Sequence, residues 1–590
     1  MNHKKVKQLF FEHYEKLNHS WTPDVSLIPP EGDSSTLFIN SGMQPLKPLF
    51  LGKEKAVAKR LYNIQKCVRT GDIDEVGDNK HLTLFFMLGN WSVGDYSAQD
   101  AAKFGYDLLV NKYGMDKNKL WTTVFNGDKK LGIPKDVAME KAWPKIGIPT
   151  ERIDFQGTED LLWISGKDGP CGPTSEFHYD YGNNFGCGKK NCTPSCDCGR
   201  FTEIWNACVQ IKYMLHDGKR VTPLKLQSID GGAGFERIVA VLQGTSDVYE
   251  TTCLKPLVQQ IESLSGKKYA QNKKAMRIIA DHVRASVFIA GEGITPAKKD
   301  RGYVLRRLIR RMVRYANQLS IDRAGIKSLV RYVIDEFKGD YPYLQKRGKQ
   351  ISGVIGSEYD KFDKTIAKGT RKLNKLMSDL KTKKIPGKDV FQLYDTFGFP
   401  MELTKELAAE NKFTIDEKGY HAQFEKHKQV SKQGQTKKFA SGLADHSEQV
   451  VKYHTVAHLL LAALQRVLGS KVSQRGSNLT AERLRFDFNW DSSMTPEQKK
   501  KTEDLVNKWI SEKIAVTMKE MSMADAKKAG AAGAFEHKYG AKVRVYTIGK
   551  VSKEICSGPH VKNTFEIGKF RIKKEKSSSA GVRRIKAVLE

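Results

Sequence analysis

A glycine-rich stretch, Ser228–Gly244 (SIDGGAGFERIVAVLQG), does most to constrain the fold of this chain. Asp230 ends a predicted strand, three glycines follow (Gly231, Gly232 and Gly234), and an amphipathic helix opens with Glu236-Arg237. Glycines let a backbone turn sharply and approach a ligand closely. An arginine in the first helical turn presents a planar cation suited to phosphate. The stretch predicts a strand–turn–helix at a phosphate site, with a plain turn and a surface arginine as the alternative.

The composition indicates a multidomain protein with a polyanionic partner. The chain has 590 residues, a formal net charge of +32 and 39% apolar residues. That length predicts several domains, and the apolar content excludes a disordered chain. The excess of basic residues favours nucleic acid as a partner, with general solubility as the alternative. The sequence shows no apolar run of about 20 residues and no signal peptide, so we expect a cytoplasmic protein without a membrane partner.

Two further segments point to chemistry. Lys66–Arg69 and Leu82–Leu88 read as strands of an antiparallel hairpin, which places Arg69 at the end of the first strand beside a polar loop. In that position Arg69 could clamp a phosphate or form a surface ion pair. Four cysteines within a Gly/Pro/Asn-rich loop have no apolar neighbours that would make them core residues, and they predict either a zinc site or free thiols. They are Cys187, Cys192, Cys196 and Cys198.

These segments, taken in order, resemble the catalytic domain of the alanyl-tRNA synthetase family, which belongs to the class II aminoacyl-tRNA synthetases. The resemblance rests on KCVRTGDIDEVGDNKHLTLFFMLGNWSVGDY, DGPCGPTSEFHYD, EIWN and SIDGGAGFERIVAVLQG. It implies an α+β multidomain protein: an antiparallel sheet with flanking helices that binds ATP and alanine over residues 1–245, a helical tRNA-recognition domain over 246–430, a linker over 431–442, and an α+β editing domain over 443–590.

The resemblance also implies roles for residues of the catalytic domain. Arg69 and Arg237 would bind the phosphates of ATP, which arrives with Mg²⁺, and Gly234 would line the same site. Asp230 and Asn206 would hold the ammonium and carboxylate of L-alanine. Met87, Trp163 and Gly232 would form the walls of the amino-acid pocket. Such walls exclude larger side chains, but they cannot exclude glycine and discriminate only weakly against serine, so the enzyme would need an editing activity.

The chain departs from the family pattern at two places in this domain. Phe86 stands where the family usually has a glutamate, and Ala207-Cys208-Val209-Gln210 replaces the usual Val-Phe-Met-Gln. Phe86 keeps a second hypothesis open, a tRNA-binding or hydrolytic relative whose synthetase site no longer works. The joint presence of Arg69, Asn206, Asp230 and Arg237 argues against it.

The helical region contains an arginine stripe in Gly302–Leu319. Arg306, Arg307, Arg310, Arg311 and Arg314 share one face of the predicted helix, which we expect to meet a phosphate backbone; a solvated face is the alternative. We predict tRNA contacts for Arg306, Arg310 and Arg314. The family resemblance places Asp395 at a G·U-reading position in the tRNA acceptor stem. Lys298 stands where the family has an asparagine, and a lysine suits a phosphate better than a base edge.

The C-terminal part contains a second set of metal ligands. His454 and His458 lie four residues apart on a predicted helix, and Cys556 and His560 follow about a hundred residues later. A lone HxxxH is often ordinary helix surface, but the two pairs together predict a tetrahedral Zn²⁺ site. The segment resembles the editing domain of the family, with Gln474 in its pocket region and Ser557 where glycine is usual. We expect a short form of alanyl-tRNA synthetase, without the family's C-terminal oligomerisation domain, that acts as a monomer on tRNA(Ala).

Overall fold

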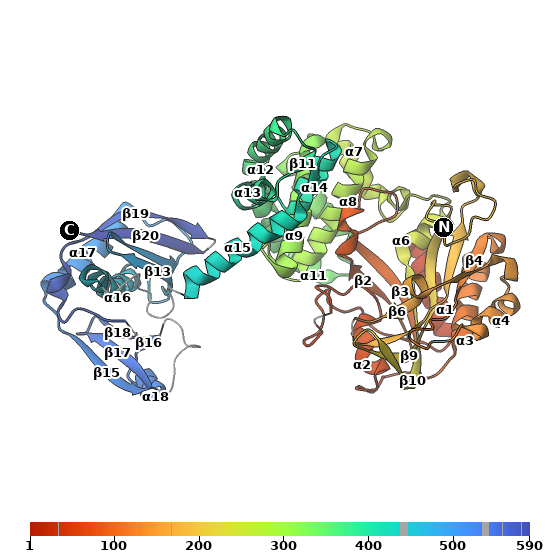
Figure 1. The fold of residues 1–590 in the computed structure, drawn as a ribbon, viewed down its shortest axis with the longest axis horizontal. Helices are drawn as coiled ribbons and strands as arrows, with labels where there is room; N and C mark the ends of the chain where they lie inside the picture. The colour runs from red at the N-terminus through yellow and green to blue at the C-terminus, as the bar shows by residue number, and fades with distance from the viewer. Residues whose placement is uncertain (34, 167, 437–446, 534–541, 557, 580) are drawn as a thin grey trace. The chain divides into compact units, whose positions relative to one another are not determined.

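The computed structural model describes residues 1–590 except Ser34, Lys167, 437–446, 534–541, Ser557 and Ala580. Its contacts divide the chain into two compact units, Met1–Asp416 and Glu417–Glu590 (Figure 1). Among the described helices, none has an apolar stretch that could span a bilayer.

A ten-stranded, largely antiparallel sheet forms the centre of the N-terminal half of the first unit. Its main path runs β1-β2-β3-β10-β9-β8-β4-β5, and β6 and β7 join at the side of β9. Among the described strands of this sheet, only the pairs β1/β2 and β4/β5 are parallel. The strands are β1 (Ser20–Trp21), β2 (Arg60–Val68), β3 (Leu84–Val93), β4 (Leu120–Phe125), β5 (Ile153–Gln156), β6 (Leu162–Ile164), β7 (Pro170–Pro173), β8 (Glu176–Asp180), β9 (Phe201–His216) and β10 (Arg220–Gly234). The predicted hairpin is confirmed as β2 and β3.

Helices flank this sheet, as expected. Helix α1 (His3–Lys16) begins at Asn2, whose side chain accepts a hydrogen bond from the amide of Lys5. It buries Val6, Phe10 and Tyr14, an apolar stripe at helical spacing. The other helices of this half are α2 (Lys47–Phe50), α3 (Ala98–Tyr106), α4 (Val137–Ile146), α5 (Thr158–Leu161) and α6 (Phe235–Leu242).

The rest of the first unit is helical. Helix α8 (Tyr269–Gly291) is buried along its whole second half, because α7 (Lys255–Ser265), α9 (Asp300–Gln318) and α10 (Arg323–Phe337) pack around it. The region also contains α11 (Pro342–Lys346), α12 (Gly348–Asp379), α13 (Gly387–Phe397), α14 (Met401–Glu410) and the short strand pair β11 (Lys384–Ile385) and β12 (Thr414–Ile415). The predicted domain limit at residue 245 stays a prediction, since both segments belong to one compact unit.

The second unit is an α+β domain with two four-stranded sheets, ordered β13-β14-β20-β19 and β15-β17-β18-β16. Its apolar core gathers around α16 (Glu448–Leu468), which packs against α17 (Pro496–Ser511). The predicted linker, 431–442, begins inside helix α15 (Glu417–Thr436), and 437–442 lie outside the described residues. The remaining elements are β13 (Gln474–Thr480), β14 (Arg483–Asn489), β15 (Val516–Ser522), α18 (Met523–Lys528), β16 (Ala532–Gly533), β17 (Lys542–Ile548), β18 (Ser552–Ile555), β19 (Phe570–Ser579) and β20 (Val582–Leu589).

Candidate active site and metal centres

Gly231, Gly232 and Gly234 lie in a strand rather than in the predicted turn. Strand β10 continues through Gly234 and pairs with β3 on one side and β9 on the other. A Cβ atom on Gly231 would lie 2.4 Å from the amide oxygen of Asn90, and one on Gly232 would lie 3.0 Å from Sδ of Met87. The glycines are therefore needed for close packing between strands. The helix begins at Phe235, so Arg237 does lie in its first turn, as predicted.

A pocket opens over these central strands. The eight residues predicted from the sequence to bind ATP or alanine all line it: Arg69, Met87, Trp163, Asn206, Asp230, Gly232, Gly234 and Arg237. Its other walls come from residues that the sequence reasoning did not assign to the site: Ser41, Asp72, Lys80, His81, Leu82, Phe85, Glu203, Val209 and Glu236. Several of these stand next to predicted site residues in EIWN and in the hairpin, which is the signal that could have found them. The roles of the lining residues in substrate binding stay predictions.

The two predicted phosphate arginines enter the pocket from different elements. The exposed Arg69 follows β2, and its guanidinium lies over the ring of Phe85 at 4.8 Å while Nε donates to the carbonyl oxygen of Asn40. Arg237 extends from α6, and its Nη1 lies 3.3 Å from the carboxylate of Glu203 on β9. Stacking and a carboxylate both reduce the conformational freedom of a guanidinium, so both cations are positioned before a ligand arrives.

Asp230 is a buried carboxylate at the base of the pocket. Its side chain accepts a hydrogen bond of 2.7 Å from the indole Nε1–H of Trp91, and the residue is 7% exposed. Burial raises the pKa of Asp230 to about 7, against the lowering effect of the Trp91 bond. A cation bound at this carboxylate would favour its ionised form. Asp230 therefore has the environment expected of a carboxylate that binds an ammonium group.

Asn206 lies in β9 opposite Gly232 of β10. Its amide oxygen accepts a bond from the hydroxyl of Thr174, and its amide nitrogen donates to Glu176 at 3.3 Å. Burial raises the pKa of Glu176 to about 7, with a further contribution from nearby Glu203. Because both the oxygen and the nitrogen of the Asn206 amide are bonded, the orientation of this amide in the wall of the pocket is fixed.

Phe86 does not face the pocket. Successive side chains of a strand point to opposite faces, so Phe85 and Met87 line the pocket and Phe86 points away from it. Phe86 is 6% exposed and packs against Phe288, Phe337 and Tyr341, with ring centroids 5.6–6.0 Å apart. The replacement of a glutamate at this position therefore changes the packing behind the sheet and leaves the lining of the pocket intact. Of the second departure, Val209 reaches the pocket while Ala207 and Cys208 are buried.

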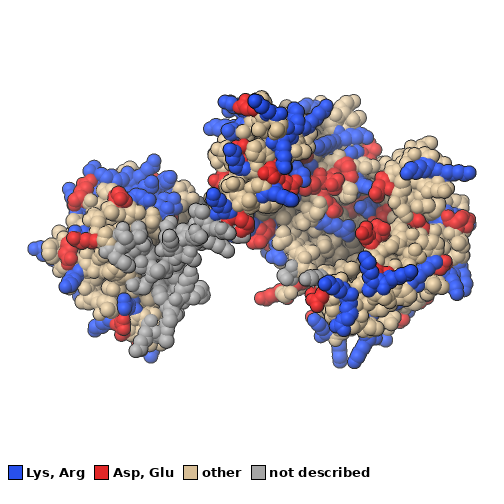
Figure 2. All heavy atoms as spheres, viewed as in Figure 1, with Lys and Arg blue, Asp and Glu red and all other residues tan. Residues whose placement is uncertain are grey.

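The arginine stripe of α9 is placed differently from the prediction. Figure 2 shows basic side chains over much of the visible surface, but these arginines are mostly enclosed and meet carboxylates of neighbouring helices. Arg310 pairs with Glu358 of α12 at 2.5 Å, Arg306 approaches the same carboxylate at 3.6 Å, and Arg314 pairs with Glu406 and Glu410 of α14. The stripe is therefore not a free basic face, because its partners come from other elements and are invisible in the helix's own sequence. The tRNA contacts of Arg306, Arg310 and Arg314 stay predictions.

The two other predicted tRNA contacts lie at the surface. Lys298 is exposed in the segment before α9, and Asp395 is exposed on α13. Both can meet a partner from solvent. Their contacts with tRNA stay predictions.

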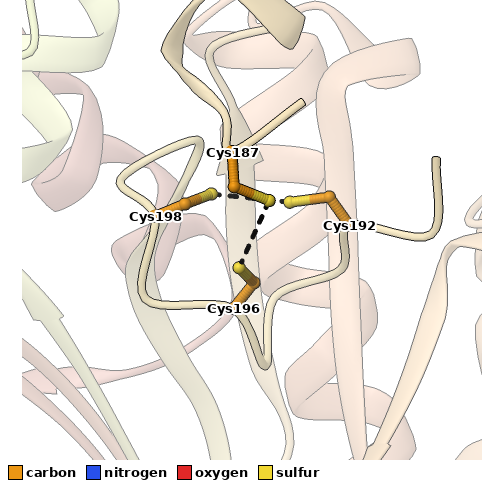
Figure 3. A group of neighbouring side chains, drawn as sticks. All are labelled: Cys187, Cys192, Cys196 and Cys198. Atoms are coloured by element: carbon orange, nitrogen blue, oxygen red, sulfur yellow. Dashed lines mark hydrogen bonds between the residues drawn. The ribbon is translucent and has the colours of Figure 1, made fainter. Parts of the chain in front are cut away.

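The four cysteines of the loop between β8 and β9 converge on one point (Figure 3). The sulfur atoms of Cys187 and Cys196 are 3.8 Å apart, those of Cys192 and Cys198 are 3.5 Å apart, and all four lie within 4.8 Å of one another. Four thiolates around Zn²⁺ at about 2.3 Å have sulfur–sulfur distances of roughly 3.8 Å. The arrangement therefore fits a tetrahedral zinc site. Arg200 anchors the base of the loop through a two-pronged bond to Asp180.

The second predicted ligand set also comes together. His454 and His458 project from one face of α16 toward Cys556 and His560, and the four ligand atoms lie within 4.8 Å of one another. Although burial alone would raise the pKa of Cys556, the surrounding imidazoles, above all that of His454 at 3.3 Å, lower it to about 2, which favours the thiolate that metals bind. The Nε2 atom of His560 is buried without a hydrogen-bond partner among the described residues. A metal ion would satisfy that atom.

Each of these histidines also has a contact at its other ring nitrogen, Nδ1. Nδ1 of His454 lies 3.0 Å from the carbonyl oxygen of Pro559, Nδ1 of His458 lies 3.0 Å from Glu554, and Nδ1 of His560 lies 3.2 Å from the hydroxyl of Thr455. Engaging Nδ1 leaves Nε2 of each ring as the metal-binding atom. Of the other editing-region residues, Gln474 lies at the start of β13 and bonds to Ser477, and Ser557 lies outside the described residues.

Comparison with known proteins agrees with this geometry. Residues 5–473 match the family of class II (A) tRNA synthetases, and residues 543–586 match the second additional domain of threonyl and alanyl tRNA synthetases. The chain is 43% identical to the alanine–tRNA ligase of Borrelia hermsii, with 99% of both chains covered. It is 41% identical to that of Treponema pallidum, covering 99% of this chain and 98% of the relative.

Longer relatives also match. The chain is 33% identical to the alanine–tRNA ligase of Acetivibrio thermocellus, covering 99% of this chain and 79% of the relative. Family profile and full-length similarity thus point the same way as the pocket and the two ligand sets. The chain belongs to the alanine–tRNA ligase family of class II tRNA synthetases.

Proposed function

We propose that this protein is an alanine–tRNA ligase. It activates L-alanine with ATP, transfers the alanyl group to the 3′ end of tRNA(Ala), and hydrolyses seryl- and glycyl-tRNA(Ala) at a second site. The observation that carries the first activity is the convergence of Arg69, Arg237, Asn206 and Asp230 on one pocket. The juxtaposition of two cations with a buried carboxylate matches the charges of ATP and of a free amino acid.

In the activation step, a carboxylate oxygen of alanine attacks the α-phosphorus of ATP, a new O–P bond forms, and pyrophosphate leaves. Asp230 accepts the ammonium of alanine, and the Asn206 amide orients its carboxylate. Arg69 and Arg237 neutralise the charge that develops on the phosphates, so the pocket acts mainly through positioning and electrostatics.

Mg²⁺ would enter this pocket with ATP and screen its phosphates. The ion prefers hard oxygen ligands and usually takes one or two carboxylates together with substrate phosphates. Asp72 and Glu203 both line the pocket and supply such oxygens. They are the residues that we propose to hold it.

The pocket also explains why a second activity is needed. Met87, Trp163 and Gly232 can exclude side chains larger than alanine's, but glycine fits any pocket that accepts alanine, and serine adds only a hydroxyl. We assign the hydrolysis of the resulting esters to the site of His454, His458, Cys556 and His560. Zn²⁺ bound by these four residues would supply Lewis acidity toward the ester.

The four-cysteine loop is a second proposed zinc site, with a structural role, because a ligand set made of four cysteines is typical of structural zinc. Metal analysis should give two zinc ions per chain. Cys196→Ser should lower the content to one and leave seryl-tRNA hydrolysis in place. Cys556→Ala should also lower it to one and abolish that hydrolysis.

The whole function is tested by charging tRNA(Ala) transcripts with labelled alanine and by following the decay of pre-formed seryl-tRNA(Ala). Charging with alanine together with rapid loss of the seryl ester is the expected result. A folded, zinc-loaded protein that hydrolyses the ester but forms no alanyl-tRNA would instead support a hydrolytic relative. The monomeric state and the cytoplasmic location remain predictions, of which the first is tested by light scattering.

A further inference from the structure

The loop between β2 and β3, residues 69–83, supplies much of the wall of the pocket. Asp72, Lys80 and His81 line the pocket from this loop. Inside the loop, Asp78 accepts bonds from the amides of Lys80 and His81 and lies 2.6 Å from the His81 ring. These local bonds shape the second half of the loop. They do not reach its first half, the turn Gly71–Asp74 that carries Asp72.

The first half of the loop is held by an arginine of the helical region. Arg311 of α9 donates from Nη1 to the carbonyl oxygen of Ile73 at 2.8 Å and from Nη2 to that of Val76 at 3.1 Å. Ile73 and Val76 are fully buried and Arg311 is 5% exposed, so these bonds are shielded from water. Shielded bonds from a charged donor are among the stronger hydrogen bonds in proteins.

The other donors of Arg311 fix the arginine itself. Nε and Nη2 bond to the two carboxylate oxygens of Glu406 on α14, at 3.0 and 2.8 Å. The remaining N–H of Nη1 lies 3.3 Å from Nε2 of His282 on α8. All five N–H groups of the guanidinium therefore have an acceptor. A lysine has three donors around a single nitrogen and cannot reproduce this fork.

The contact with His282 extends the network to the far end of the loop. Nδ1 of His282 lies 2.8 Å from Asp281, and the other oxygen of Asp281 accepts a bond of 2.7 Å from the amide of Thr83. Since Arg311 donates to Nε2, the ring proton must sit on Nδ1, where Asp281 accepts it. Thr83 in turn accepts a bond from the amide of Arg69 at 3.0 Å. One buried network thus holds both ends of the loop.

We propose that Arg311 is a positioning residue for nucleotide binding: it holds residues 69–83 in the shape that presents Arg69 and Asp72 to the pocket. The role rests on the proposed function and deepens it, since it ties the geometry of the nucleotide site to the position of α9. It also gives one arginine of the stripe a function other than contact with RNA. The residues that we propose to bind alanine lie on β3, β6, β9 and β10 rather than in this loop, so alanine binding depends on Arg311 much less.

The test compares full-length wild-type protein with Arg311→Lys. This variant keeps the positive charge but loses the planar, forked arrangement of the guanidinium donors. Tyr315→Phe serves as the matched control, because it removes a bond of 2.7 Å to the same Glu406, and Tyr315 has no hydrogen bond or ring contact with the described residues of the loop. Hydrogen exchange is followed on peptides covering 69–83 and on peptides from β9 and β10. ATP affinity is measured directly by calorimetry, and KM for alanine by pyrophosphate exchange.

For Arg311→Lys we expect exchange at least about 10-fold faster in the loop only, ATP binding about 10-fold weaker, and KM for alanine within about twofold of wild type. Tyr315→Phe should resemble wild type in all three. Unchanged loop protection, unchanged ATP affinity, or equal losses for ATP and alanine would overturn the proposal. If the wild-type protein shows no alanine-dependent pyrophosphate exchange, the proposed function is contradicted instead. The hydrogen-exchange and ATP-affinity measurements would still test the role of Arg311.

Discussion

The indole Nε1–H of Trp91 donates a hydrogen bond of 2.7 Å to Oδ1 of Asp230 across the pair β3/β10. The bond occupies one oxygen of a buried carboxylate that lines the pocket, and the other oxygen has no hydrogen-bond partner among the described residues. Because Trp91 is fully buried, the carboxylate cannot easily turn away. The free oxygen is therefore presented to a ligand in a fixed orientation, and this gives the first prediction.

Binding of L-alanine should weaken as the pH falls below 7. Burial raises the pKa of Asp230 to about 7, so acid converts the group that receives the ammonium into a neutral one. KM for alanine should rise about 10-fold per pH unit below 7, while KM for ATP changes little. Asp230→Asn should give a flat pH profile and a kcat/KM for alanine at least about 100-fold lower at pH 8, the equivalent of roughly 3 kcal/mol. A wild-type KM for alanine that is level from pH 5.5 to 8 would contradict this.

Thermal unfolding of the same variant separates binding from folding. The pKa of Asp230 is raised in the folded state, so its contribution to stability is fully present at low pH and is lost as the pH rises through 7. Without alanine, Asp230→Asn should therefore unfold at a higher temperature than wild type at pH 8, with the difference disappearing toward pH 4. A variant less stable than wild type at pH 8 would indicate that the lost activity reflects misfolding.

Phe86→Leu should cost stability without weakening ATP binding. The ring of Phe86 packs against Phe288, Phe337 and Tyr341 on the side of the sheet away from the pocket. We expect a loss of about 1–2 kcal/mol in the free energy of unfolding by urea, from lost aromatic packing and a small cavity. KM for ATP in pyrophosphate exchange should stay within twofold of wild type. A tenfold rise in that KM at normal stability would place Phe86 in the nucleotide site.

Glu554→Gln should weaken metal binding at the hydrolytic site. Glu554 lies 3.0 Å from Nδ1 of His458 and is largely buried, so it orients the ring and increases its basicity. Loss of such a partner typically lowers metal affinity roughly 10- to 100-fold. Competition with a zinc chelator measures the affinity, and alanine activation in the other unit provides the internal control. Equal zinc affinity in the variant and wild type would rule out this role.

Arg310→Ala should destabilise the fold, because the buried carboxylate of Glu358 would lose its cation at 2.5 Å and keep only Arg306, at 3.6 Å. Removing one partner of a buried pair costs about 3–5 kcal/mol. Arg331→Ala is the control: its side chain is 86% exposed and pairs with Asp335 within α10, so its loss should change stability by less than about 1 kcal/mol. If Arg310→Ala keeps wild-type stability and instead weakens tRNA binding, the original expectation for the stripe would be restored.

Local sequence spacing predicted helices and strands, but it did not predict the surroundings of every side chain. The i,i+4 spacing of His454 and His458 places both imidazoles on one face of α16 whatever surrounds it. The hairpin around Arg69 follows equally from two apolar runs and a polar loop. These features depend on neighbours in the chain, so they can be read from the sequence.

The features that the sequence did not predict depend on distant residues. Position 231 requires a glycine because Asn90 fills the space where a side chain would be. Phe86 is buried because helices behind the sheet cover it. Arg310 is buried because Glu358 comes from α12. In each case the deciding partner lies 40 or more residues away, and only the folded chain shows it.

Alanine-dependent ATP–pyrophosphate exchange tests the central claim most directly, since it reports the pocket of Arg69, Asn206, Asp230 and Arg237 without tRNA or the hydrolytic site. Wild-type protein should catalyse exchange with alanine, more weakly with glycine and serine, and Arg237→Ala should reduce it at least about 100-fold while remaining folded. No alanine-dependent exchange from folded, zinc-loaded wild-type protein would contradict the account.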